Sequence, residues 1–120
     1  MSAEPILDEA IIRELEELDA GGGGGFLAQI IGVFEEQAVD LLQQLEAAVN
    51  HELMPEICAL SHKLKGSART VGGARLGIHC ERLEHAARSR EVIDGPSQMS
   101  RIRDAYGELV QVLHARLARG

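Results

Sequence analysis

The residues of this chain with the clearest chemical potential lie together in the stretch SHKLKGSARTVGG, residues 61–73. His62 is followed by Lys65 at i+3 and Gly66 at i+4, inside a segment whose apolar spacing is otherwise that of a helix. A glycine in a helix interior costs about 1 kcal/mol relative to alanine. Its position one turn after a histidine therefore suggests that a bulky reactant must reach the ring.

This spacing suits the acceptance of a phosphoryl group. A neutral imidazole is a good nucleophile near neutral pH, and its phosphorylated product carries about two negative charges. Because helical side chains lean toward the N-terminus, Gly66 leaves the surface over His62 open. Lys65 lies on an adjacent row of the helix, where its ammonium can approach the ring and stabilise the added charge.

A helical wheel places the histidine on the solvent side. At 100° per residue, His62 lies about 140° from the centre of the apolar face, with Gly66 and Arg69 also pointing outward and Lys65 at the flank. The apolar face that we expect in the core consists of Leu53, Ile57, Leu60, Ser61, Leu64, Ala68 and Val71.

Helical periodicity continues through most of the chain, without a strand pattern of any length. Short breaks separate the periodic segments: the glycine run at 21–25, whose role beyond flexibility is not indicated, and then NHELMP, Gly72-Gly73 and IDGPSQ. Short connections favour antiparallel neighbours. The sequence therefore predicts one all-α domain, residues 1–120, built as an antiparallel four-helix bundle with a short additional N-terminal helix. The expected helices are at about 6–19, 26–50, 54–71, 74–90 and 96–118.

Composition narrows the class of protein. The net charge of −7 argues against nucleic acid as a partner. No apolar run approaches the roughly 18–20 residues that span a membrane, and the N-terminus lacks the pattern of a signal peptide. Two cysteines do not make a disulfide framework. We expect an independent, cytoplasmic, monomeric protein with reduced, mostly buried cysteines.

The charges are unevenly distributed. Residues 1–61 hold thirteen Asp and Glu against one Arg, whereas residues 62–90 hold seven Lys and Arg against two Glu. Two interpretations remain open: the basic residues pair with the acidic first half inside the fold, or they form a basic rim that steers an acidic partner toward His62.

The sequence also resembles a known family. The stretch SHKLKGSARTVGGARLGIHCERLEHAARS, residues 61–89, resembles the histidine-containing phosphotransfer (HPt) domain, whose pattern is roughly H-x-L-K-G-S followed by a C-x-x-L-E helix. FLAQIIGVFEEQAVDLLQQLEAAV, residues 26–49, is similar to the family's second helix, so the resemblance covers nearly the whole chain. Departures are mild: TVGG replaces the commoner LGA, and Ser61 stands where alanine is usual.

The resemblance implies a role for each matching residue. His62 would be phosphorylated, Lys65 would stabilise the phosphoryl group, and Gly66 would provide clearance. In the family a polar residue on the following helix often orients the histidine ring, and by spacing that residue is Glu84 here. Alternatively, Glu84 pairs with Arg88 at i+4.

The implied function is that of an intermediate in a two-component phosphorelay. Such a protein accepts a phosphoryl group from a receiver aspartyl phosphate, or from a sensor or hybrid histidine kinase, and passes it to the aspartate of a response-regulator receiver. The receiver would supply Mg²⁺, and this chain needs no cofactor. We expect a phosphocarrier and not an enzyme, since the chain has no phosphate-binding glycine loop of a kinase. Docking would use Lys63, Lys65, Arg69 and Arg88.

Two other functions are compatible with parts of the sequence. An HPt-like adaptor would bind signalling partners without phosphotransfer. A metal site could begin with Cys58 and His62 at i, i+4, but Cys80 and His85 on the next helix point in different directions, so we expect no metal.

Overall fold

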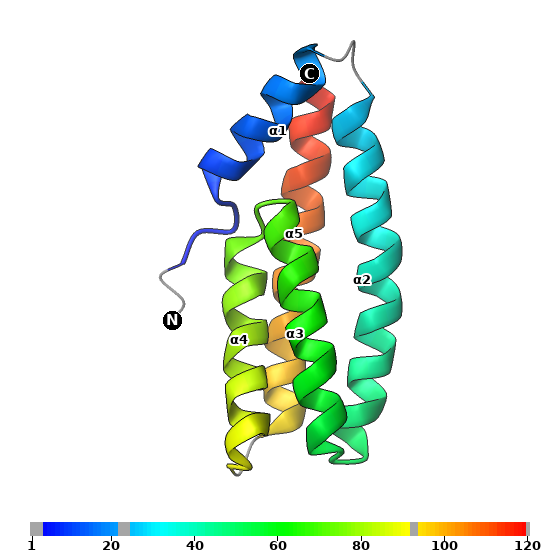
Figure 1. Cartoon of the computed structure of the whole chain (residues 1–120), viewed down its shortest axis with the longest axis vertical. Helices are drawn as coiled ribbons and strands as arrows, with labels where there is room; N and C mark the ends of the chain where they lie inside the picture. Colours follow the sequence, from blue (N-terminus) through cyan, green and yellow to red (C-terminus); the bar gives the residue numbers. More distant parts are fainter. Residues whose placement is uncertain (1–3, 22–24, 92–93, 120) are drawn as a thin grey trace.

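The computed structural model describes residues 4–21, 25–91 and 94–119. Within these residues the chain forms a bundle of α2 to α5, whose consecutive helices run antiparallel, with α1 across one end (Figure 1). The predicted all-α fold with an additional N-terminal helix is thus confirmed. In the described part of the chain no helix is long and apolar enough to cross a membrane. The helices are α1 (Glu9–Gly21), α2 (Phe26–Asn50), α3 (Met54–Thr70), α4 (Ala74–Ser89) and α5 (Gly95–Arg119).

The core is mostly aliphatic, since the chain has only two Phe, one Tyr and no Trp. Leu45, Leu64, Leu83 and Leu109, from four different helices, are each fully buried, and each contributes about 1.5–3 kcal/mol of hydrophobic free energy. The prediction is wrong for one residue expected in the core. Leu53 is 45% exposed because it lies just before α3 and does not share the orientation of the helical face.

The first helix begins at Glu9, three residues later than predicted. The residues before it pair with the loop between α3 and α4: Leu7 forms an antiparallel bridge with Gly73, and the Asp8 N–H donates to the Gly72 carbonyl at 2.7 Å. The Ile6 carbonyl accepts from the Ala74 N–H at 3.1 Å, and the Ala10 N–H donates to the Asp8 carboxylate at 3.1 Å, so the helix begins after Asp8. The other helices begin and end within one residue of the predicted bounds.

The glycine run connects α1 to α2, and Gly22 to Gly24 lie outside the described residues. On either side of them the two helices are joined directly, because Asp19 Oδ1 of α1 accepts hydrogen bonds from the backbone N–H groups of Phe26 at 2.7 Å and Leu27 at 3.2 Å. Gly25 has a φ of 89°, which favours glycine. A side chain of one helix therefore satisfies free donors at the start of the next.

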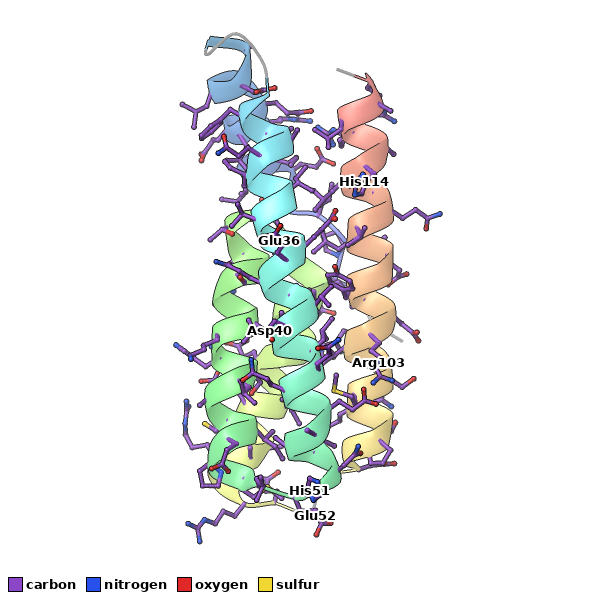
Figure 2. The ribbon with its side chains drawn as sticks, turned by 90° about the vertical axis from the view of Figure 1, so that its right-hand side faces the viewer. Glu36, Asp40, His51, Glu52, Arg103 and His114 are labelled. Carbon is purple, nitrogen blue, oxygen red and sulfur yellow. The ribbon has the colours of Figure 1, made fainter. Side chains whose placement is uncertain are left out.

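Contacts between charged and polar side chains join α5 to α1 and to α2. Arg116 of α5 binds two glutamates of α1, Glu9 and Glu16. Arg103 and His114 lie along α5 beside α2 (Figure 2), where they contact Glu46 and Glu35 respectively. The α3–α4 pair, by contrast, carries the candidate functional residues.

Candidate functional site

The histidine and its proposed partners lie on α3 and α4, which are packed side by side (Figure 1). His62 and Lys65 belong to α3, and Glu84 and Arg88 belong to α4. The His62 side chain is 66% exposed, as the wheel predicts, whereas the Glu84 side chain is only 4% exposed. The site is thus an accessible ring standing on a buried carboxylate.

Glu84 is in contact with three positively charged or hydrogen-bonding side chains. Its Oε2 lies 2.9 Å from His62 Nδ1 and 2.6 Å from Arg88 Nη2, and its Oε1 lies 2.7 Å from Lys65 Nζ. The two alternatives left open by the sequence, a ring contact and an Arg88 pair, are therefore both present. They are compatible because one carboxylate oxygen can accept more than one hydrogen bond.

These contacts determine which nitrogen of His62 is free. Burial raises the pKa of Glu84, but the hydrogen bonds and charges of Lys65 and His62 outweigh it, so this pKa lies below its ordinary value. Glu84 is then ionised at neutral pH and can only accept. Nδ1 of a neutral His62 ring must therefore carry the hydrogen and donate it, which leaves the lone pair on Nε2. Among the described residues, nothing hydrogen-bonds Nε2.

Gly66 is open to solvent. A Cβ placed on it would meet no atom within 4 Å, so packing does not require glycine here. Gly73 is different, since a Cβ there would lie 2.6 Å from Leu109 Cδ2 and 3.0 Å from the Ala68 carbonyl. The fold needs the glycine at 73 but not the one at 66, which supports clearance for an incoming molecule as the reason for Gly66.

The two cations near the ring differ in accessibility. Lys65 is 14% exposed, and its ammonium binds the far oxygen of Glu84. Arg88 is 64% exposed and binds the same oxygen as His62. The sequence predicts that the Lys65 ammonium can approach the ring. The structure shows it bound to Oε1 of Glu84, whose other oxygen contacts Nδ1.

The basic segment is partly paired. Arg69 lies 3.7 Å from Glu81, and Arg75 lies 3.1 Å from Glu108. Lys63 is exposed and has no ion pair with another described residue. Most pairs are thus made with glutamates of the second half, not with the acidic first half, and several cations still reach solvent around His62.

The other histidines and the cysteines are less suited to chemistry. His114 uses Nε2 to contact Glu35, which is the reverse of the His62 arrangement. Burial, followed by the charge of Arg82, lowers the pKa of His79. Burial raises the pKa of Cys80 to about 12, so its thiol stays protonated. In the described part of the chain no three His, Cys, Asp or Glu side chains gather as a metal site would require.

The structure also has an apolar groove that the sequence analysis did not predict. It lies between α2 and the end of α3 and is lined in part by Phe26, Ile30, Val33 and Thr70. Val33 is 48% exposed and Phe26 is 41% exposed. Thr70, Gly66 and His62 succeed one another at four-residue spacing, so they share one side of α3. The groove therefore joins the surface that carries His62.

Comparison with known proteins agrees with the fold. The model of the Hpt domain family matches residues 29–112. The chain belongs to the Hpt domain family. Multistep phosphorelay regulator 1 of Schizosaccharomyces pombe is 28% identical over 96 residues, which cover 78% of this chain and 32% of that protein. The chain thus spans about a third of the length of that relative.

Solved structures share the architecture. Histidine-containing phosphotransfer protein B from Pseudomonas aeruginosa PAO1 superposes with a TM-score of 0.84 at 21% identity, over 99% of both chains. Saccharomyces cerevisiae Ypd1, crystallised with the receiver domain of its downstream response regulator Ssk1, superposes with a TM-score of 0.66 at 22% identity, over 96% of this chain and 90% of that one. At these identities the likeness concerns the fold.

Proposed function

We propose that this chain is a phosphorelay intermediate that carries a phosphoryl group on Nε2 of His62. The donor is a receiver aspartyl phosphate or a histidine kinase, and the acceptor is the aspartate of a response-regulator receiver. One observation carries the proposal: Glu84 holds Nδ1, so the exposed Nε2 keeps its lone pair beside the open surface at Gly66. Membership of the Hpt domain family and the receiver complex of Ypd1 support the same role.

The chemical step needs little from this chain. The Nε2 lone pair attacks phosphorus, the bond from phosphorus to the aspartate oxygen breaks, and the carboxylate departs with that electron pair. The hydrogen on Nδ1 stays in place throughout. Lys65 and Arg88 stabilise the added negative charge. The receiver supplies Mg²⁺ and the acidic pocket, so this chain acts as a phosphocarrier through position and charge and not as an enzyme.

Docking is proposed to use the cations around His62 and the apolar groove. Lys63, Arg69 and Arg88 are exposed and would face the acidic pocket of the receiver. Exposed charges are screened beyond about 8–10 Å at physiological ionic strength. Association should therefore slow as salt is added, whereas Val33→Ser in the groove should weaken binding without changing that salt dependence. We propose that the protein works as a monomer in the cytoplasm.

The test is transfer from a phosphorylated receiver to wild type, His62→Gln and His114→Gln. His114 is a matched control, because it is also exposed and also contacts a glutamate. We expect label that is lost in acid and survives alkali in wild type and His114→Gln, and none in His62→Gln. If wild type binds receivers but takes no label from several donors, the chain is an adaptor and the proposal is wrong.

A further inference from the structure

The Glu84 carboxylate beneath the ring affects how long the phosphorylated state of His62 lasts. This inference rests on the proposed function. Phosphohistidine loses its phosphoryl group when the bond between phosphorus and Nε2 breaks and the electron pair remains on Nε2. If Nδ1 carries a hydrogen, the leaving group is neutral imidazole. Without that hydrogen it is an imidazolate anion, which is a far poorer leaving group. The rate of loss therefore depends on what holds Nδ1.

In this chain a buried negative charge holds it. Glu84 is the one acidic residue buried among residues 4–21, 25–91 and 94–119, and its Oε2 is 2.9 Å from Nδ1. An ionised carboxylate at this distance favours the protonated partner. Lys65 and Arg88 in turn keep the carboxylate ionised in its buried position.

We propose that Glu84 retains a hydrogen on Nδ1 of phosphorylated His62, and so makes this phosphohistidine a fast donor to receivers and a short-lived species without them. In transfer, a receiver carboxylate oxygen attacks phosphorus and the bond to Nε2 breaks. The electron pair stays on Nε2, and the product is the neutral ring still donating from Nδ1 to Glu84. No proton enters or leaves the ring.

The charges around Glu84 determine how its replacement would change the lifetime of phosphorylated His62. Lys65 from α3 and Arg88 from α4 contact the same carboxylate as the ring. A second groove, beside Glu84, is lined by charged and titratable side chains of α4 and of the segment just after it, and by one uncharged amide of α5. They are Glu81, Arg82, His85, Glu91 and Gln98. Replacing Glu84 by glutamine removes the anion and leaves both cations unbalanced. They would then stabilise the dianionic phosphoryl group and oppose a proton on the ring, so both effects lengthen the lifetime.

The experiment follows loss of phosphate from the purified, folded phosphoprotein between pH 5 and 10. The variants are wild type, Glu84→Gln and Glu81→Gln. Glutamine keeps an acceptor oxygen for Nδ1, so ring orientation is preserved and only the charge is lost. Glu81 is the matched control, since it is on the same helix one turn earlier, is 55% exposed and pairs with Arg69 and not with the ring. Phosphoramidate or a phosphorylated receiver serves as donor.

We expect Glu84→Gln to lose phosphate about tenfold more slowly than wild type at pH 8, because an opposite charge at this range changes a protonation equilibrium by at least about tenfold. The pH above which hydrolysis slows should also be lower in Glu84→Gln than in wild type. Glu81→Gln should match wild type, and all three should coincide once denatured. If phosphorylated wild type and Glu84→Gln show the same profile, the inference is wrong and the proposed function stands. If wild type forms no phosphohistidine at residue 62, both are wrong.

A second variant keeps the test independent of how Glu84→Gln folds. Arg88→Gln alters an exposed side chain and leaves Glu84 with one cation fewer. The hydrogen on Nδ1 is then held more strongly, and the dianionic phosphoryl group loses a stabilising charge. Arg88→Gln should shorten the lifetime at pH 8, which is the opposite of the Glu84→Gln effect. A longer lifetime in Arg88→Gln would contradict the inference.

Discussion

Gly66 makes the fold less stable than it could be, and its replacement should separate stability from function. The residue lies in the interior of α3, is exposed, and would offer a Cβ no contact within 4 Å. Gly66→Ala should therefore stabilise the protein by about 1 kcal/mol, the difference in helix propensity between the two residues. For a domain of this size the expected rise in melting temperature is roughly 4 °C.

The same change should impair phosphotransfer. A side chain at 66 lies over the patch through which a receiver reaches Nε2. We expect Gly66→Ala to slow transfer from a phosphorylated receiver, and the longer Gly66→Gln to slow it by at least about tenfold, equivalent to 1.4 kcal/mol of activation free energy. Thermal unfolding followed by circular dichroism measures the first effect, and initial rates of phosphate transfer measure the second.

Gly107 provides the control. It too is exposed within a helix, α5, with no atom within 4 Å of a Cβ, but it is not part of the α3–α4 site. Gly107→Ala should give the same stabilisation, and Gly107→Gln should transfer phosphate at the wild-type rate. If Gly66→Gln also transfers at the wild-type rate, the clearance argument is refuted. If Gly66→Ala is destabilising, then the glycine has a structural role that the packing does not reveal.

Three further outcomes follow from the packing and the charges. Gly73→Ala should destabilise the fold by about 1–3 kcal/mol, measured by urea unfolding, because its Cβ would overlap buried atoms; a neutral effect would contradict the close approach. Alkylation with iodoacetamide at pH 8.5 should label only the half-buried Cys58 in the folded protein, since the pKa of the buried Cys80 is raised to about 12 and its thiol is protonated below that pH; rapid labelling of both would argue otherwise. Arg116→Ala should lower the free energy of unfolding by about 1 kcal/mol, because it removes both carboxylate contacts to α1. It should speed amide hydrogen exchange in α1 but not in α3. An equal increase in both helices would contradict a local role for Arg116.

The sequence predicts the fold and the exposed partners of the site well, because both depend on local periodicity. The spacing of His62 and Gly66 on one helix determines that they share its outer side, whatever that helix packs against. The resemblance to HPt domains adds Glu84, which no periodicity within one helix can place beside a residue 22 positions earlier.

Tertiary contacts account for what the sequence analysis missed. Lys65 is tied to Glu84 because packing of α3 on α4 brings a buried carboxylate within 2.7 Å of its ammonium. The start of α1 is delayed because Leu7 pairs with a loop more than sixty residues away. The capping of α2 by Asp19 likewise joins a side chain of one helix to the backbone at the start of the next. Long-range geometry of this kind leaves no signal in hydrophobic spacing.

The most direct test of the central claim is the phosphorus NMR spectrum of the phosphorylated, folded protein, recorded for wild type and His62→Gln. The chemical shift distinguishes phosphate on Nε2 from phosphate on Nδ1 of a histidine. The Glu84 contact at Nδ1 predicts a single Nε2 phosphohistidine that is absent from His62→Gln. An Nδ1 phosphohistidine, or the same signal in His62→Gln, would contradict the account.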